Sequence, residues 1–195
     1  QDHPNIELRF IASLRIMDFV RDEIDVAIRF GEAPEDDGLH SEALFDEIIT
    51  PMMTPALAAR HGTLEGLRDA PLLHDDSIDF LTPKVDWPAW LRLAGVDRPG
   101  HTGPRFSQAD HGIDAALAGG GLILARTPLA AGALRDGLLV APFDIAMTPR
   151  AKYRMVHQKG AENRPHLAAF MAWIRAEAAD MAAVNARFDP VPPPT

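Results

Sequence analysis

The chain has 195 residues, enough to bury a core in one domain or in two small domains that share a cleft. Apolar residues make up 47% and charged residues 24%, a balance typical of a folded globular protein. The net charge of -9 argues against binding of a phosphate backbone by these residues, and the lack of cysteine excludes disulfides, thiol nucleophiles and cysteine zinc sites.

The start of the chain predicts a β-α-β unit. Polar and apolar residues alternate over residues 7–12, which indicates a strand with one buried face. Ile16, Phe19, Val20 and Ile24 share one face of a predicted helix, and residues 25–30 form a second β-rich apolar run. Two strands joined by a helix run in the same direction, so parallel pairing is expected.

The next segment predicts a loop, a strand and a capped helix. Residues 31–41 carry an acidic cluster that composition assigns to a solvated loop. Residues 48–53 form an extended apolar run, and Pro51 inside it favours an edge or crossing strand. Thr54 is expected to cap a short helix that ends at Gly62.

Strands and helices alternate through the rest of the chain, which predicts an α/β fold with mostly parallel sheets and ligands beyond the carboxyl ends of the strands. Gly119 to Gly121 stop a helix, and the proline-rich residues 189–195 are expected to be a frayed end. The predicted strands are residues 71–74, 105–108, 122–125, 138–141 and 152–157. The predicted helices are residues 87–94, 110–117 and 128–134, and one that begins at Pro165.

Polar side chains at two strand-to-helix turns are candidate ligand contacts. Ser107, Gln108 and Asp110 lie where exposed backbone N–H groups and short side chains can bind a carboxylate or phosphate. Ser107 or Asp110 can equally be an ordinary helix cap. Thr127, before Pro128, presents the same choice between a cap and a ligand contact.

Other candidates come from the first strands and from residue 74. Ser13 precedes the first predicted helix as a possible cap, and Arg15 suits either an anionic ligand or the solvated surface. Phe30 and Gly31 close a strand, where Phe30 belongs either to the core or to the wall of a pocket. His74 is followed by two aspartates, but a single histidine beside them lacks the spacing of a metal site, so we expect no metal there.

Catalysis finds little support in the motifs. The sequence has no Gly-x-Ser-x-Gly elbow, no His-Glu-x-x-His pair and no P-loop, so we expect no enzyme and no cofactor. No stretch approaches the roughly 20 apolar residues of a membrane helix, and residues 1–4 lack the features of a signal peptide. A cytoplasmic protein without membrane contact is expected.

Several segments together resemble the effector-binding domain of LysR-type transcriptional regulators, especially the glycine-cleavage-activator-like subgroup. They are HPNIELRF at residues 3–10, DFV at 18–20, DVAIRFG at 25–31, PLLH at 71–74, WPAWL at 87–91 and GGGLILA at 119–125. No single segment is specific, but they follow the family's order and spacing over residues 3–180.

The resemblance implies a periplasmic-binding-protein-like fold, in which two Rossmann-like subdomains are joined by two crossing strands. Residues 1–52 with 149–195 would form subdomain I, and residues 53–148 subdomain II. A small effector, expected to be anionic, would bind in the cleft between them, and His74, at a strand end of subdomain II, would line that cleft. In the family a strand and a helix precede the segment that matches residues 1–10, and we expect a fold in which this N-terminal strand and helix are missing.

The same resemblance implies the partners. The intact protein would be a homodimer or homotetramer that binds DNA through an N-terminal helix-turn-helix outside this sequence. The effector would shift the geometry of that oligomer. Two alternatives remain open: a solute-binding protein of a transporter, which would need an export signal, and an enzyme of the same fold, such as a dehydratase or deaminase.

Overall fold

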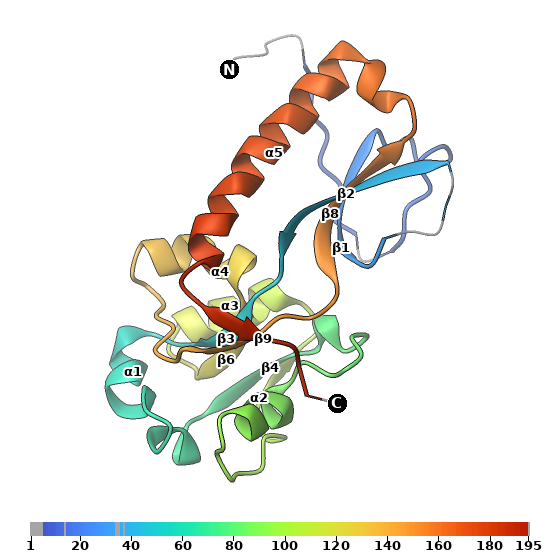
Figure 1. The fold of residues 1–195 in the computed structure, drawn as a ribbon. Helices are drawn as coiled ribbons and strands as arrows, with labels where there is room; N and C mark the ends of the chain where they lie inside the picture. The colour runs from blue at the N-terminus through green and yellow to red at the C-terminus, as the bar shows by residue number, and fades with distance from the viewer. Residues whose placement is uncertain (1–5, 14, 34–35, 37, 195) are drawn as a thin grey trace. The chain divides into compact units, whose positions relative to one another are not determined.

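The computed structural model describes residues 6–13, 15–33, 36 and 38–194. It contains two compact units, which are both drawn in Figure 1 and are described separately below. The first unit comprises Gln1–Phe45 and Lys152–Asp180, and the second comprises Asp46–Ala151 and Met181–Thr195. The expected subdomain boundaries differ from this division most at the C-terminus, because the residues after 180 pack in the second unit.

A mixed sheet in the order β5-β4-β6-β3-β7-β9 forms the centre of the second unit. β4 pairs in parallel with β5 and β6, β7 pairs in parallel with β9, and β3 is antiparallel to both β6 and β7. The strands are β3 (Ile49–Met52), β4 (Leu72–Asp75), β5 (Arg105–Phe106), β6 (Leu122–Arg126), β7 (Ile145–Met147) and β9 (Asp189–Val191).

Helices cover both faces of this sheet (Figure 1). Ile123 and Ala125 of β6 belong to one core with Ile113 and Leu134, which lie on α3 and α4. Because side chains alternate along a strand, Leu124 faces the other way, where it lines a pocket with α2. The helices are α1 (Pro55–His61), α2 (Trp87–Leu93), α3 (Ala109–Leu117) and α4 (Thr127–Arg135), with short 3-10 helices at Gly66–Asp69 and Asp76–Ile78.

The first unit contains a smaller sheet, in the order β1-β8-β2, and most of a long helix. β1 and β8 pair in antiparallel fashion from Val26 opposite His157 to Gly31 opposite Lys152. Met155 and Met171 belong to its buried core. The elements are β1 (Val26–Gly31), β2 (Leu39–Asp46), β8 (Lys152–Gln158), the 3-10 helix Ala161–Asn163 and α5 (Pro165–Asn185).

The β-α-β unit predicted at the start of the chain is wrong. Residues 6–13 contain no strand, residues 16–24 contain turns at 19–23 and no helix, and β1 pairs antiparallel with β8. Most of the apolar side chains that would form the buried faces, such as Phe10 and Ile16, are exposed, although Phe19 is buried. Since an amphipathic pattern becomes a stable element only when its apolar face is covered, the pattern alone was not sufficient here.

Several other expectations about strands are corrected. β3 is an interior strand, not an edge strand; Pro51 fits there because β7 pairs with β3 only at Ile49, so no donor is needed at Pro51 on that side. The strand predicted at residues 138–141 is reduced to one bridge between Val140 and Met53. Residues 189–191 of the tail are not frayed, since they form β9, which pairs with β7.

The remaining predicted strands and helices are confirmed, with ends shifted by a few residues, but the loop predicted at residues 31–41 is shorter, because Gly31 ends β1 and β2 begins at Leu39. The confirmed strands are those predicted at residues 25–30, 48–53, 71–74, 105–108, 122–125 and 152–157. The confirmed helices are those predicted after Thr54, at residues 87–94, 110–117 and 128–134, and from Pro165. Parts of the acidic loop (34–35 and 37) and the first five residues lie outside the described residues. Within the described part of the chain, no helix combines the length and apolarity that crossing a bilayer requires.

Candidate functional site

Three parallel strands of the second unit end at one edge of its sheet. β5, β4 and β6 are neighbours that run in the same direction, so their carboxyl ends lie side by side. α3 follows β5 after a short turn, and α4 follows β6 directly, which brings two helix N-termini to this edge. Open α/β sheets bind ligands at such an edge. The predicted contacts here are His74, Ser107, Gln108, Asp110 and Thr127.

The turn between β5 and α3 presents free polar groups. Gln108 is the N-cap residue of α3, and its side chain makes no capping hydrogen bond. Ser107, Gln108 and Asp110 are all exposed, and within the described residues no hydrogen bond involves the Ser107 hydroxyl. The capping alternative for Ser107 and Asp110 is therefore wrong, and the hydroxyl is free to meet a ligand.

The hydroxyl of Thr127, at the start of α4, already forms a hydrogen bond within the fold. Its side chain is fully buried, and its hydroxyl donates to Asn185 Oδ1 at 2.8 Å. The Asn185 amide in turn donates to the carbonyl oxygen of Asp46 at 2.9 Å. Arg126, not Thr127, is the N-cap residue of α4. A direct contact between the Thr127 hydroxyl and an effector would require this hydrogen bond to break.

A buried ion pair at the same edge was not predicted. Arg126, the last residue of β6, donates from Nε to Glu47 Oε2 at 2.6 Å. The Arg126 and Glu47 side chains are 9% and 0% exposed. Their positions are 79 residues apart in the sequence, and nothing in the local pattern around either residue indicates the pairing.

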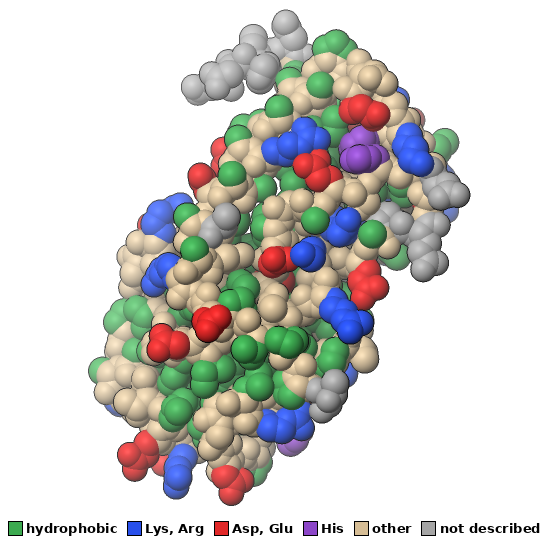
Figure 2. Space-filling view, in the orientation of Figure 1, with side chains coloured by type: hydrophobic (Ala, Val, Ile, Leu, Met, Phe, Trp, Pro, Cys, Tyr) green, Lys and Arg blue, Asp and Glu red, His purple; other side chains and the backbone are tan. Residues whose placement is uncertain are grey.

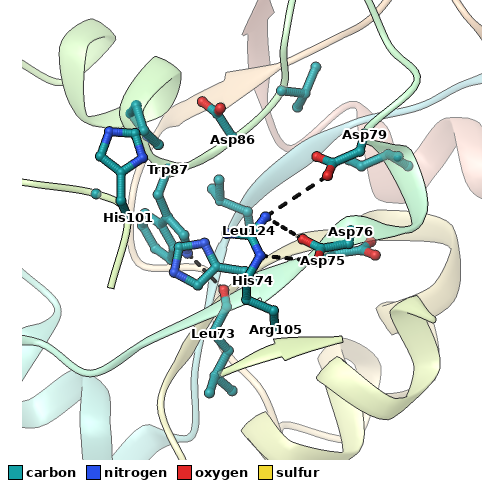
Figure 3. Close-up of a pocket in the computed structure, with 14 residues that line it drawn as sticks. Leu73, His74, Asp75, Asp76, Asp79, Asp86, Trp87, His101, Arg105 and Leu124 are labelled. Atoms are coloured by element: carbon teal, nitrogen blue, oxygen red, sulfur yellow. Dashed lines mark hydrogen bonds and ion pairs between the residues drawn. The ribbon is translucent and has the colours of Figure 1, made fainter. Parts of the chain in front are cut away.

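A pocket of about 90 Å³ lies at the carboxyl end of β4, entirely within the second unit (Figure 3). His74 lines it; the imidazole is 6% exposed, and its Nε2 lies 3.2 Å from the carbonyl oxygen of Thr102. The Trp87 indole also lines it and donates to the Leu73 carbonyl at 2.8 Å. The lining residues are Leu73, His74, Asp75, Asp76, Ile78, Asp79, Val85, Asp86, Trp87, Pro88, Gly100, His101, Arg105 and Leu124.

The charges around this pocket are unequally matched. Arg105 forms two hydrogen bonds to the Asp76 carboxylate, one from Nε at 3.0 Å, and its Nη2 lies 3.9 Å from Asp79 (Figure 3). The hydrogen bond with Asp76 raises the pKa of the Arg105 guanidinium above its ordinary value. Burial raises the pKa of Asp75, although hydrogen bonding with Ser77 and the charge of Arg126 act in the opposite direction.

The predicted contacts of the first unit lie on two segments. Ser13 and Arg15 are exposed on the irregular N-terminal segment, where Ser13 Oγ accepts from the Arg15 backbone N–H at 3.1 Å and caps no helix. Phe30 is half-buried on β1, and its ring lies 5.3 Å from that of Tyr153 on β8. Gly31 ends β1, and a side chain added there would meet open space.

Metal binding has no geometric support in the part of the chain that is described: there, no group of three or more histidine, aspartate or glutamate side chains is arranged to hold an ion. The residues that sequence reasoning missed at this edge are Glu47, Arg105, Asp86 and Trp87. Of these, only Asp86 and Trp87 had a local signal, a cap followed by a helix; Asp86 accepts from the Ala89 N–H at 2.9 Å.

Comparison with known proteins supports the same fold and family. Residues 1–179 match the family described as the LysR substrate binding domain. The chain is 34% identical to the glycine cleavage system transcriptional activator of Escherichia coli K12 over 182 residues, which are 91% of this chain and 57% of that protein. It is 30% identical to the HTH-type transcriptional activator AmpR of Citrobacter koseri over 178 residues, 89% of this chain and 58% of that protein. The chain thus spans little more than half the length of these relatives.

Solved structures agree. The effector domain of the regulator AmpR from Pseudomonas aeruginosa superposes with a TM-score of 0.71 at 26% identity, covering 93% of this chain and 85% of that one. The AmpR effector binding domain of Citrobacter freundii shares the fold, with a TM-score of 0.68 at 21% identity over 92% of this chain and 86% of that one. These likenesses confirm the periplasmic-binding-protein-like α/β fold, and the chain belongs to the LysR substrate binding domain family.

Proposed function

We propose that this chain is the ligand-sensing part of a DNA-binding transcriptional regulator, and that its ligand is a small, anionic effector. The observation that carries the proposal is the family match over residues 1–179. The named relatives are transcriptional activators, and each is considerably longer than this chain. The chain itself would have no catalytic role.

The turn before α3 is the best-supported contact for an anionic group. Backbone N–H groups at a helix N-terminus are unpaired and carry a partial positive charge, which favours a carboxylate or phosphate. The free Ser107 hydroxyl adds a donor at the same place. The remaining proposed effector contacts are Ser13, Arg15, Phe30, Gly31, His74, Gln108, Asp110 and Thr127.

DNA binding would belong to a helix-turn-helix outside this chain. The net charge is -9, and Figure 2 shows acidic and basic side chains interspersed over the described residues of the displayed face. Such a surface lacks the clustered cations that release counterions from a phosphate backbone. The intact protein would act in the cytoplasm as a homodimer or homotetramer.

The proposal is tested first by effector binding. We would screen small carboxylic acids and their phosphorylated analogues by thermal denaturation, since a ligand at 100 times its Kd stabilises a protein by about 2.7 kcal/mol. For any acid that binds, Ser107→Ala is expected to weaken the affinity about tenfold, the equivalent of one hydrogen bond of about 1.4 kcal/mol. The melting temperature without ligand should be unchanged, because Ser107 makes no stabilising bond.

Ser107→Thr is the matched control, since it keeps the hydroxyl and should retain most of the affinity. Equal affinity of the wild type and Ser107→Ala in calorimetry would remove Ser107 from the binding site. The part of the reading frame upstream of Gln1 tests the regulatory role itself. A basic helix-turn-helix there supports it, whereas an export signal would make the protein a solute receptor.

A further inference from the structure

The pocket at the end of β4 is separate from the Ser107 turn. Its walls come from β4, the first turn of α2, Arg105 and the segment that contains Gly100 and His101 (Figure 3). Ser107, Gln108 and Asp110 are not among its lining residues. A ligand in this pocket would therefore meet groups that the proposed effector contact does not use, except for His74.

The lining is acidic. Four aspartates line the pocket, against one arginine and two histidines. Arg105 is already paired with Asp76 and Asp79, so its charge is largely offset by theirs. Asp75 and Asp86 form no ion pair in the described residues. The pocket therefore has an excess of negative charge, which favours a cation in it.

Two buried oxygen atoms beside the pocket lack hydrogen-bond partners. Asp75 Oδ1 accepts from the backbone N–H of Ser77 at 2.9 Å, but Asp75 Oδ2 is buried without a partner in the described residues. The Ser77 hydroxyl oxygen is the second such atom, and its interaction with Asp75 acts to lower the pKa of that carboxyl. Buried acceptors in native proteins are nearly always satisfied, so Asp75 Oδ2 is able to accept from a further donor.

The size and the remaining walls restrict what that donor can be. A volume of about 90 Å³ holds several water molecules or one small organic ion, since a single water needs about 10–15 Å³ of such a cavity. Ile78, Val85 and Leu124 provide apolar surface next to the carboxylates. A cation with several N–H donors and a short hydrocarbon part fits this lining in charge, in hydrogen bonding and in size.

We propose that this pocket binds the ammonium group of a small primary amine, with Asp75 and Asp86 as its anionic partners. The inference goes beyond the proposed function, because it concerns a pocket inside the second unit and requires no contact with Ser107. If Ser107→Ala loses the binding of carboxylic acids, the prediction of amine binding in this pocket still stands.

The Trp87 indole provides a direct reporter, because it lines the pocket and its N–H donates to another lining residue, Leu73. We would titrate the ¹⁵N-labelled chain with ethylammonium chloride at constant ionic strength and follow the three tryptophan indole signals by two-dimensional NMR. The Trp87 signal should shift and saturate, while that of Trp173, in the first unit, should stay in place. Ethanol, sodium propionate and sodium chloride at equal concentration should leave Trp87 unshifted.

Charge-neutral variants test the partners. Asp75→Asn and Asp86→Asn should each weaken ethylammonium binding at least tenfold; asparagine at position 86 still caps α2. Asp97→Asn is the matched control, since it removes the same charge from an exposed site of the same unit outside the pocket, and its affinity should equal that of the wild type. The indole signals of Trp90 and Trp173 verify that each variant is folded.

Three results would overturn the proposal: no saturating shift of Trp87, an equal shift with propionate or sodium chloride, or unchanged affinity in both aspartate variants. Ammonium chloride separates the two possible sources of the cation. Tighter binding of ethylammonium supports an organic amine, whereas tighter binding of ammonium would reduce the pocket to a site for a simple inorganic cation.

Discussion

Glu47 and Arg126 form a buried ion pair at the carboxyl ends of the parallel strands in the second unit. Both side chains are buried, so removing Glu47 takes the carboxylate at 2.6 Å away from a buried guanidinium, which is costly. We expect Glu47→Ala to lower the free energy of unfolding by about 3–5 kcal/mol, measured by urea denaturation. Glu42→Ala is the control: its partner Arg175 is partly exposed, and such pairs contribute about 1 kcal/mol or less. If both variants lose the same free energy of unfolding, the buried pair is no more important for stability than the partly exposed pair.

The raised pKa of Asp75 predicts how the stability of the fold depends on pH. Burial is the largest cause that raises its folded-state pKa above the unfolded value, so the folded protein binds the proton more tightly. Stability is therefore highest below the unfolded pKa, falls as pH rises towards the folded pKa, and stays lower above it. Asp75→Asn cannot titrate, so its stability relative to the wild type should rise over that interval. Parallel pH profiles in urea denaturation would show that Asp75 keeps its ordinary pKa.

At the residue scale, sequence reasoning succeeded where the signal is local. Thr54 and its proline neighbour indicated a cap that the structure confirms. The pairing of Glu47 with Arg126 joins residues far apart in sequence, and no local pattern encodes it. Thr127 has the residue type of a ligand contact, but only the fold shows that Asn185 occupies its hydroxyl.

Among the elements, α1 offers a test of local encoding. The Thr54 hydroxyl accepts from the Leu57 N–H at 3.3 Å and satisfies one unpaired donor at the helix start. Thr54→Ala should lower the free energy of unfolding by about 1 kcal/mol, as measured by chemical denaturation. Thr54→Ser keeps the hydroxyl oxygen and should lower the free energy of unfolding by only about 0.3 kcal/mol. If serine lowers it as much as alanine does, the packing of the threonine methyl group is responsible and not the cap.

Elements were predictable when their own residues carry the stabilising contacts. α1, α2 and α5 begin at a proline or after a capping side chain, and β6 is a continuous buried apolar run. The predictions failed where a partner decides the outcome. Residues 7–12 and 16–24 have good amphipathic patterns but leave most of their apolar side chains exposed, although Phe19 is buried. The short β7, in contrast, forms because β3 and β9 lie beside it.

On the scale of the whole molecule, the sequence indicated two units but not the full path of the chain. The chain passes from one unit to the other after Phe45, after Ala151 and within α5, after Asp180. The third passage could not be predicted, because residues 189–195 contain four prolines and look like an unpaired end. Pairing with β7 is a property of the folded sheet.

Truncation tests whether this tail is structural. A chain ending at Asn185 loses β9 and the hydrogen bond from Thr148 N–H to the Val191 carbonyl at 2.9 Å. With a net value of about 1 kcal/mol for each backbone hydrogen bond, we expect the free energy of unfolding to fall by about 2–3 kcal/mol. A chain ending at Val191 keeps β9 and should lose less. If the chain that ends at Asn185 has the same melting temperature as the wild type, the tail contributes no stability and the original expectation of a frayed end is correct.

The late return of the chain also means that the second unit combines one long segment, the end of α5 and one short, separable strand. Such a strand need not be covalently attached to complete a sheet, since an extended peptide can add to an open edge through its main chain. A protein cut within residues 186–188 should therefore accept the tail supplied in trans as a synthetic peptide, and a fluorophore on that peptide would convert docking at β7 into a signal for the folded state of this unit.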